Sequence, residues 1–179
     1  RIIGQAVITL SNRARPMLTI ENNLTRLIRP LAKLPSNLRI STLSFILGKV
    51  VPFVGTSSLR YEEVTPTRVV VSIRNRRPVQ NHIKGVHAAA MALLAETATG
   101  FVVGVNLSDD KLPLIKSLHV DFKRRTVGDM RAVASLSEEQ VAIIRSSPKG
   151  ELLVPVTVTD ESGEEPIQCQ MLWAWVSKK

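Results

Sequence analysis

One carboxylate stands alone in a long apolar run of this chain. Between Lys84 and Asp109 the only formally charged side chain is Glu96, and its neighbours are mainly Ala, Leu, Met, Val and Thr. Burying an unpaired carboxylate among such residues costs on the order of several kcal/mol and perturbs its pKa, which suits an acid, a base or a nucleophile. A salt-bridged structural acid is the alternative. The neighbours of Glu96 and the nearby His87 favour a working residue.

The run around Glu96 predicts a helix over roughly residues 87–103 that is apolar nearly all round and therefore buried. Its abundant alanines would let a curved sheet pack closely against it. Glu96, several threonines and a polar entry loop argue against a membrane span. The residues before and after this helix predict strands over 67–74 and 130–136, with others ending near 64 and covering 118–123, 154–158 and 167–175. A short helix over 137–145, with a capping box at Ser137 and Gln140, interrupts them. The fold class expected is α+β, with an antiparallel sheet and segregated helices.

The N-terminal third predicts amphipathic helices outside this unit. Apolar residues recur at helical spacing from Leu24 to Leu34, Pro30 interrupts them, and a second apolar face runs from Leu43 to Val50. We therefore predict a helical extension over residues 1–58 and a main domain over 59–179. Basic amphipathic helices can contact an anionic membrane, but capping of the main domain is favoured because bulky aromatic anchors are lacking.

Composition limits the partners and the compartment. The 179 residues carry a net charge of +9, which favours an anionic partner, and a single cysteine, Cys169, indicates a reducing compartment and a cytoplasmic location. An organelle-targeting remnant is the alternative, because the N-terminal segment contains Arg1, Arg13 and Arg15. Aromatic residues make up only 4% of the chain, and no nucleic-acid-binding signature is present, so nucleic acid is not expected as the partner.

The spacing of three residues resembles a known family. Asn81 is followed six residues later by His87, and Glu96 follows nine residues after His87. This pattern resembles the hotdog-fold acyl-CoA thioesterases of the phenylacetyl-CoA type, as does the later run from Phe122 to Asp129. The resemblance covers residues 59–177 and implies a hotdog fold, in which an antiparallel β-sheet wraps around a central α-helix. One departure is that Ala88 and Ala89 stand where the family usually has two glycines after the histidine.

The spacing also predicts a homodimer. Ala88 and Glu96 are eight residues apart, about 12 Å along a helix, so a single thioester carbon cannot contact both within one chain. A two-fold dimer would place Glu96 of one chain near Ala88 of the other. A dimer of dimers is left open.

The mechanism expected from these positions is thioester hydrolysis. The backbone N–H of Ala88, at the positive end of the helix, would bind the thioester oxygen as negative charge develops on it. Glu96 would act as a general base on water or attack the carbonyl itself, and Asn81 and His87 would orient the loop and the substrate.

Basic clusters offer contacts for the phosphates of coenzyme A. Lys123, Arg124 and Arg125 form the first candidate, with a solvated strand end as the alternative, and a second candidate cluster is formed by Arg74, Arg76 and Arg77. No cofactor and no metal are expected, because the three histidines, His82, His87 and His119, show no metal-ligand spacing.

Two other functions compete with thioester hydrolysis. A non-catalytic hotdog module that binds acyl groups or serves as a dimeric scaffold is supported by the Ala88–Ala89 pair. A dehydratase or hydratase on the same fold would pair a carboxylate with a catalytic histidine in another motif, which the chain lacks. Fold alone does not separate these functions, because function depends on the site.

Overall fold

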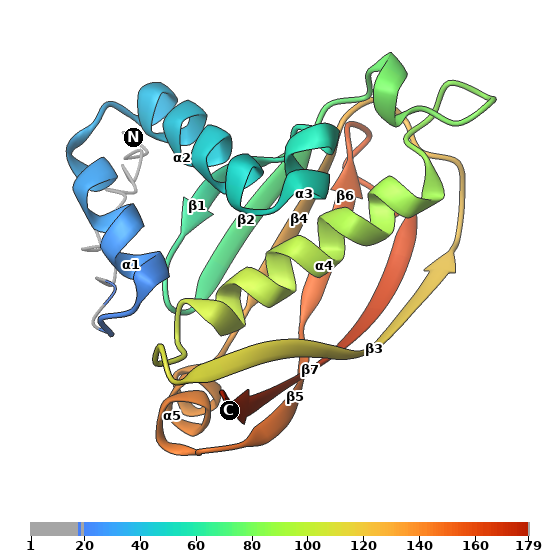
Figure 1. Cartoon of the computed structure of the whole chain (residues 1–179). Coiled ribbons are helices and arrows are strands. Elements are labelled where there is room, and N and C mark those ends of the chain that lie inside the picture. Colours follow the sequence, from blue (N-terminus) through green and yellow to red (C-terminus); the bar gives the residue numbers. More distant parts are fainter. Residues whose placement is uncertain (1–17, 19, 179) are drawn as a thin grey trace, which may run out of the picture.

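The computed structural model describes residue 18 and residues 20–178, and a strongly curved antiparallel sheet encloses one long helix (Figure 1). The α+β class is confirmed, and so is the arrangement of a sheet wrapped around a central helix. Arg1, Arg13 and Arg15, on which the targeting remnant was considered, lie outside the described residues.

The sheet has two antiparallel sections. Their strand orders are β1-β2-β4-β6 and β3-β7-β5. The strands are β1 (Arg60–Val64), β2 (Arg68–Ile73), β3 (Lys111–Phe122), β4 (Met130–Ser135), β5 (Gly150–Val154), β6 (Val156–Asp160) and β7 (Ile167–Ser177). Pro155 separates β5 from β6: Val154 pairs with Met171 of β7, whereas Val156 pairs with Ala134 of β4. One stretch of chain thus passes from one section to the other and joins them into a continuous curved surface.

Helix α4 (Ala88–Gly104) lies against the concave face of this surface and contacts strands of both sections. Its small residues let the sheet approach closely. A Cβ atom added at Gly100 would lie 2.5 Å from the ring of Trp173 on β7, so the helix backbone itself touches the sheet there. Trp173 also donates a hydrogen bond from Nε1 to the hydroxyl of Thr99, at 2.9 Å. These two contacts fix the distance and the rotation of α4 relative to β7.

Helices precede the sheet and share its core. They are α1 (Asn23–Ile28), a short 3-10 helix η1 (Arg29–Lys33), α2 (Ser36–Val50) and α3 (Pro52–Ser57). Pro30 lies in η1, which confirms that this proline ends the first helix. Leu43, Leu47 and Val54 belong to the same buried cluster as α4, so the predicted boundary at residue 58 falls between elements that share one core. None of the helices in the described part of the chain is long and apolar enough to cross a bilayer.

Most predicted elements lie where the patterns placed them, and two do not. The single strand predicted over 154–158 is divided at Pro155 between β5 and β6. Helix α5 (Glu138–Ser146) begins with the expected capping box, in which Ser137 and Gln140 bond reciprocally. Strand β3, however, begins at Lys111, and the half-buried alternation predicted for 118–123 is wrong, because Leu118 and Phe122 are exposed. The physical reason is that the described part of the chain covers neither face of this segment of β3, as its burial pattern shows.

The contact between α4 and Trp173 gives a test of the packing. We expect Gly100→Ala to lower the free energy of unfolding by about 1–3 kcal/mol, because the added methyl group would overlap the indole ring. Gly104→Ala is the matched control, since its Cβ would meet only a Leu24 methyl group at 3.6 Å. Urea unfolding of both variants measures the difference. Equal stabilities for the two variants would contradict the tight helix–sheet contact.

Candidate active site

Asn81 organises the loop that leads into α4. Its backbone N–H donates to the Gly85 carbonyl at 2.9 Å, and its side-chain Oδ1 accepts from the N–H groups of Ile83 and Gly85 at 3.0 and 3.1 Å. Lys84 takes a left-handed backbone conformation, with φ of 63°, to close the turn. Asn81 therefore holds the loop through its amide oxygen, which is consistent with the orienting role predicted for it.

His87 caps the start of α4. Its backbone N–H donates to the Val79 carbonyl at 2.8 Å, which anchors the residue to the preceding segment. Its ring Nδ1 accepts a hydrogen bond from the Ala89 N–H at 3.1 Å. An unprotonated ring nitrogen thus replaces the Ser, Thr or Asp oxygen that usually caps a helix.

The N–H of Ala88 is left available at this helix start. As the first residue of α4 it has no carbonyl four residues back in the helix, and within the described residues no other acceptor bonds to it. Ala88 and Ala89 are both exposed, so their methyl groups do not close off the helix end in the single chain. A free N–H at the positive end of a helix can stabilise a developing oxyanion.

Glu96 lies two turns further along α4 and is half-buried. No basic side chain within the described residues forms a salt bridge with it, so a salt-bridged structural acid is not what this part of the structure contains. Burial raises the pKa of Glu96 above its usual range, and the hydroxyl of Thr97, 3.5 Å away, offsets only part of that effect. Such a carboxyl can exchange protons at a higher pH than an exposed glutamate.

Tyr61 is a neighbour of this carboxylate that the sequence patterns did not single out. It is buried on β1, and its ring packs against Phe101 of α4 with a centroid distance of 4.7 Å. Burial and then the charge of Glu96 raise the pKa of Tyr61 above its usual range. Only the long-range pairing of β1 with the rest of the fold brings the two residues together.

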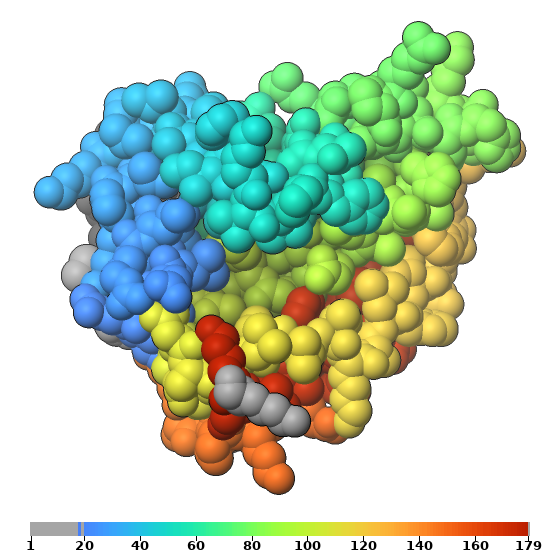
Figure 2. All heavy atoms as spheres, viewed as in Figure 1, coloured from blue at the N-terminus to red at the C-terminus, as the bar shows by residue number. Residues whose placement is uncertain are grey.

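The face of α4 that carries Glu96 is not covered by the sheet. Its less buried residues recur at helical spacing and are Ala89, Ala92, Leu93 and Glu96. In Figure 2 a band of this helix is visible between α2 and α3 on one side and β3 on the other. Glu96 is thus half-buried because the elements flanking this band shield it, while the band itself stays open.

The single chain does not bring all predicted site residues together. Asn81, His87 and Ala88 lie in one loop and helix start, whereas Glu96 is eight residues along the same helix, about 12 Å from Ala88 along its axis. Both faces of β3 expose apolar side chains, which are Leu112 and Leu114 on one face and Ile115, Leu118 and Phe122 on the other. A long apolar edge strand of this kind is a template for pairing with another chain.

The basic run after β3 is only partly available. Arg124 donates to Asp160 at 2.8 Å and to Ser162 at 2.7 Å, so its guanidinium already holds the turn after β6. Lys123 lies 3.7 Å from Asp121, and Arg125 is exposed. Of the three residues predicted to bind phosphate, Lys123 and Arg125 are therefore better placed than Arg124.

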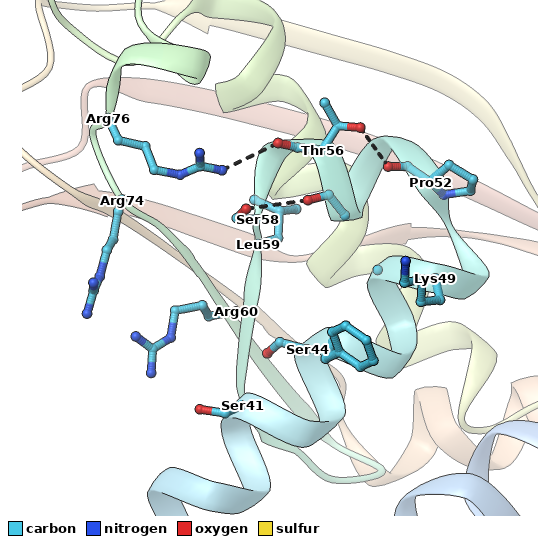
Figure 3. Close-up of a pocket in the computed structure, with 13 residues that line it drawn as sticks. Ser41, Ser44, Lys49, Pro52, Thr56, Ser58, Leu59, Arg60, Arg74 and Arg76 are labelled. Atoms are coloured by element: carbon cyan, nitrogen blue, oxygen red, sulfur yellow. Dashed lines mark hydrogen bonds between the residues drawn. The ribbon is translucent and has the colours of Figure 1, made fainter.

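Two residues of the second basic cluster line a pocket, whereas Arg77 is not among its lining residues. Arg74 and Arg76 lie beside Arg60 and Lys49 around a hollow of about 730 Å³ between α2, α3 and β1 (Figure 3). None of the residues lining it comes from α4. This pocket is therefore separate from Glu96 and from the start of α4.

The histidines and the cysteine form no metal site in the described residues, where no three His, Cys, Asp or Glu side chains come together to hold an ion. His119 lies 3.3 Å from Asp121 on exposed β3, and His82 is exposed in the loop after Asn81. Burial raises the pKa of the Cys169 thiol to about 11, which keeps it protonated and unreactive.

Comparison with family models places this architecture among known ones. The model of the family described as "Domain of unknown function (DUF4442)" matches residues 40–176. The chain belongs to this family. The match includes α4, its entry loop and all seven strands, and it begins inside α2. A search of curated proteins found no match.

Several solved structures share the fold of this DUF4442 chain. A Pseudomonas aeruginosa protein of unknown function, described as a "probable thioesterase", is 27% identical with a TM-score of 0.66, over 81% of this chain and 97% of that one. A thioesterase family protein from Silicibacter pomeroyi is 14% identical with a TM-score of 0.61, over 75% and 96%. A thioesterase from Haemophilus influenzae is 11% identical with a TM-score of 0.57, over 73% and 88%. The DUF4442 chain is thus a hotdog-fold, thioesterase-like protein.

The raised pKa of Glu96 gives a pH test of this site. Because the folded state binds this proton more tightly than the unfolded chain does, wild type should lose stability relative to Glu96→Gln as pH rises from below the ordinary glutamate value to neutral. Urea unfolding at both pH values measures the difference. Glu165→Gln, in an exposed turn, is the matched control for loss of a carboxylate. A difference between wild type and Glu96→Gln that does not change with pH would contradict the shift.

Proposed function

We propose that this protein hydrolyses acyl-CoA thioesters at two equivalent sites in a homodimer. The observation that carries the proposal is Glu96, a half-buried carboxylate on the uncovered face of α4 with a raised pKa and no ion pair among the described residues. The available N–H of Ala88 and the loop held by Asn81 supply the other parts that such a reaction needs. The thioesterase descriptions of structures with the same fold support this reaction class.

The dimer is proposed to form along β3 and the uncovered face of α4. Both surfaces are apolar and open in the single chain, and they lie next to each other (Figure 2). A two-fold axis between them would pair the β3 edges and lay two α4 helices side by side in opposite directions. Glu96 of one chain would then approach Ala88 of the partner subunit, which removes the 12 Å separation found within one chain.

In the proposed reaction Glu96 takes a proton from water while the water oxygen attacks the thioester carbon. The carbonyl oxygen becomes an oxyanion, which the N–H of Ala88 from the partner subunit stabilises. The carbon–sulfur bond then breaks, and the proton held by Glu96 passes to the departing thiolate of coenzyme A. His87 fixes the helix start through its hydrogen bond with Ala89, which keeps the N–H of Ala88 aimed outward. Lys123 and Arg125 are the proposed contacts for the coenzyme A phosphates.

Removal of the carboxylate tests the reaction directly. We expect Glu96→Gln to lower kcat by about 10²–10⁴-fold on a panel of acyl-CoA thioesters, because the amide cannot accept the proton from water. Thiol release measured with a chromogenic reagent gives the rate, and Glu165→Gln should retain activity. Equal background thiol release from Glu96→Gln and wild type would instead favour the non-catalytic acyl-binding or scaffold protein, which the Ala88–Ala89 pair also allows.

A proline at residue 88 tests the oxyanion role. Ala88 is the first residue of α4, where proline is tolerated, and His87 already has the extended backbone that precedes proline. Ala88→Pro removes the N–H and adds a small ring at an exposed position, and we expect kcat to fall by about 10²–10³-fold with the fold retained. Circular dichroism checks the fold.

Mixing the two inactive variants tests whether each site is shared between subunits. In a dimer of Glu96→Gln with Ala88→Pro, one site would keep both an intact Glu96 and an intact Ala88 N–H. Equal mixing with free exchange should therefore restore about one quarter of wild-type activity, since half of the dimers are mixed and each has one intact site. No restoration despite exchange of subunits would contradict the shared site.

A further inference from the structure

The pocket between α2, α3 and β1 concentrates positive charge. Arg60, Arg74, Arg76 and Lys49 line it, and no acidic residue is among the described residues that do so. Arg60 pairs with Ser72 across the two strands, and Arg74 lies two residues beyond Ser72, so both arginines belong to the same face of the sheet. Like charges placed this close repel each other unless an anion lies between them.

Few of these cationic side chains form a hydrogen bond or an ion pair with the rest of the described chain. Arg76 donates to the Thr56 carbonyl at 3.4 Å, which joins α3 to the segment after β2. Glu62 lies near Arg60, but its carboxylate forms an ion pair with Arg131 at 2.8 Å. Figure 3 shows Arg60 and Arg74 with Ser41 of α2 beside Arg60. The Ser44 hydroxyl already bonds to the Ile40 carbonyl and the Tyr61 N–H. Guanidinium and hydroxyl groups together are typical partners of a phosphate.

The helices that wall this pocket also expose large apolar side chains. Phe45, Val50 and Phe53 are 67%, 65% and 59% exposed, and Leu38 and Val51 are exposed as well. Phe45 also lines the pocket, and the ammonium of Lys49 lies 5.6 Å from the centre of its ring. The sequence-based preference for a capping role relied on a lack of aromatic anchors, whereas Phe45 and Phe53 project from α2 and α3 as such anchors.

A close helix crossing creates this arrangement. A Cβ atom at Gly55 would lie 2.3 Å from the Gly48 carbonyl oxygen, so α2 and α3 touch through their backbones. Leu43, Leu47 and Val54 point into the core, and the remaining apolar residues have no place except the outer surface. The exposed patch is therefore built into the fold of these two helices.

We propose that the α2–α3 face docks on a bilayer that contains anionic phospholipids. One lipid phosphate lies in the pocket, bound by Arg60 and Arg74, while Phe45, Val50 and Phe53 enter the interface beside it. A soluble phosphate compound would account for the arginines but not for the exposed apolar residues next to them. A charged bilayer surface accounts for both, because such surfaces bind basic and apolar groups together. This proposal is independent of thioester hydrolysis.

Vesicle sedimentation with the full chain tests the proposal. We expect binding to vesicles of phosphatidylcholine and phosphatidylglycerol in equal amounts, and much weaker binding to phosphatidylcholine alone. Arg60→Gln with Arg74→Gln should lower the partition coefficient by about 25-fold, since each cation near an anionic surface contributes about fivefold. Lys149→Gln with Lys178→Gln removes the same charge at exposed positions elsewhere and should change it by less than about twofold. Phe45→Ser with Phe53→Ser should lower it by about tenfold or more.

Other outcomes would overturn the membrane proposal. One is the absence of binding to the anionic vesicles, or equal binding to both kinds. Another is a loss of coenzyme A binding in the arginine variant while vesicle binding is unchanged, which would assign the pocket to a soluble phosphate. A change of molar mass in light scattering for the phenylalanine variant would make the patch a protein interface. Glu96→Gln should bind vesicles as wild type does, so failure of the proposed enzyme function would be seen separately.

Discussion

The structure depends on the need to bury α4. This helix has 17 residues and a single charged side chain, so it must be enclosed by other elements to be stable in water. The curved sheet encloses most of it, with Gly100 and Thr99 seated directly against Trp173. The charge of Glu96 is compatible with this packing only on the face that the sheet leaves open. The same packing that stabilises the fold therefore partly desolvates the carboxylate and raises its pKa.

Two open surfaces meet at this face of α4. Each exposes apolar side chains to water, which is unfavourable for a single chain. The helix face exposes Ala and Leu side chains, and the neighbouring β3 edge exposes a row of large apolar residues with one side of its backbone unpaired. In the proposed dimer one partner covers both. Such a dimer would also complete the proposed site, because the N–H of Ala88 and the carboxylate of Glu96 would face the same partner from opposite ends of the contact. The same two-fold contact would then both stabilise the dimer and complete the catalytic site.

Local features of the site and fold could be predicted, whereas long-range ones could not. The position of Glu96 in an apolar helix, the start of that helix at His87, the break at Pro30 and the cap at Ser137 depend on residues close in sequence. The contact of Tyr61 with Phe101 and the ion pair of Arg124 with Asp160 depend on strand order. The exposure of β3 was mispredicted for a related reason: alternation shows that a strand has two faces, but not whether either face is covered.

The N-terminal helices connect the surface of the molecule with the site through one short stretch of chain. Arg76 binds the Thr56 carbonyl of α3 and immediately precedes the 3-10 helix η2 (Arg77–Val79), whose Val79 carbonyl accepts the N–H of His87. The loop that Asn81 organises lies between Val79 and His87 in the sequence. The proposed contact of α3 with a bilayer would thus lie one hydrogen bond away from the segment that positions the start of α4.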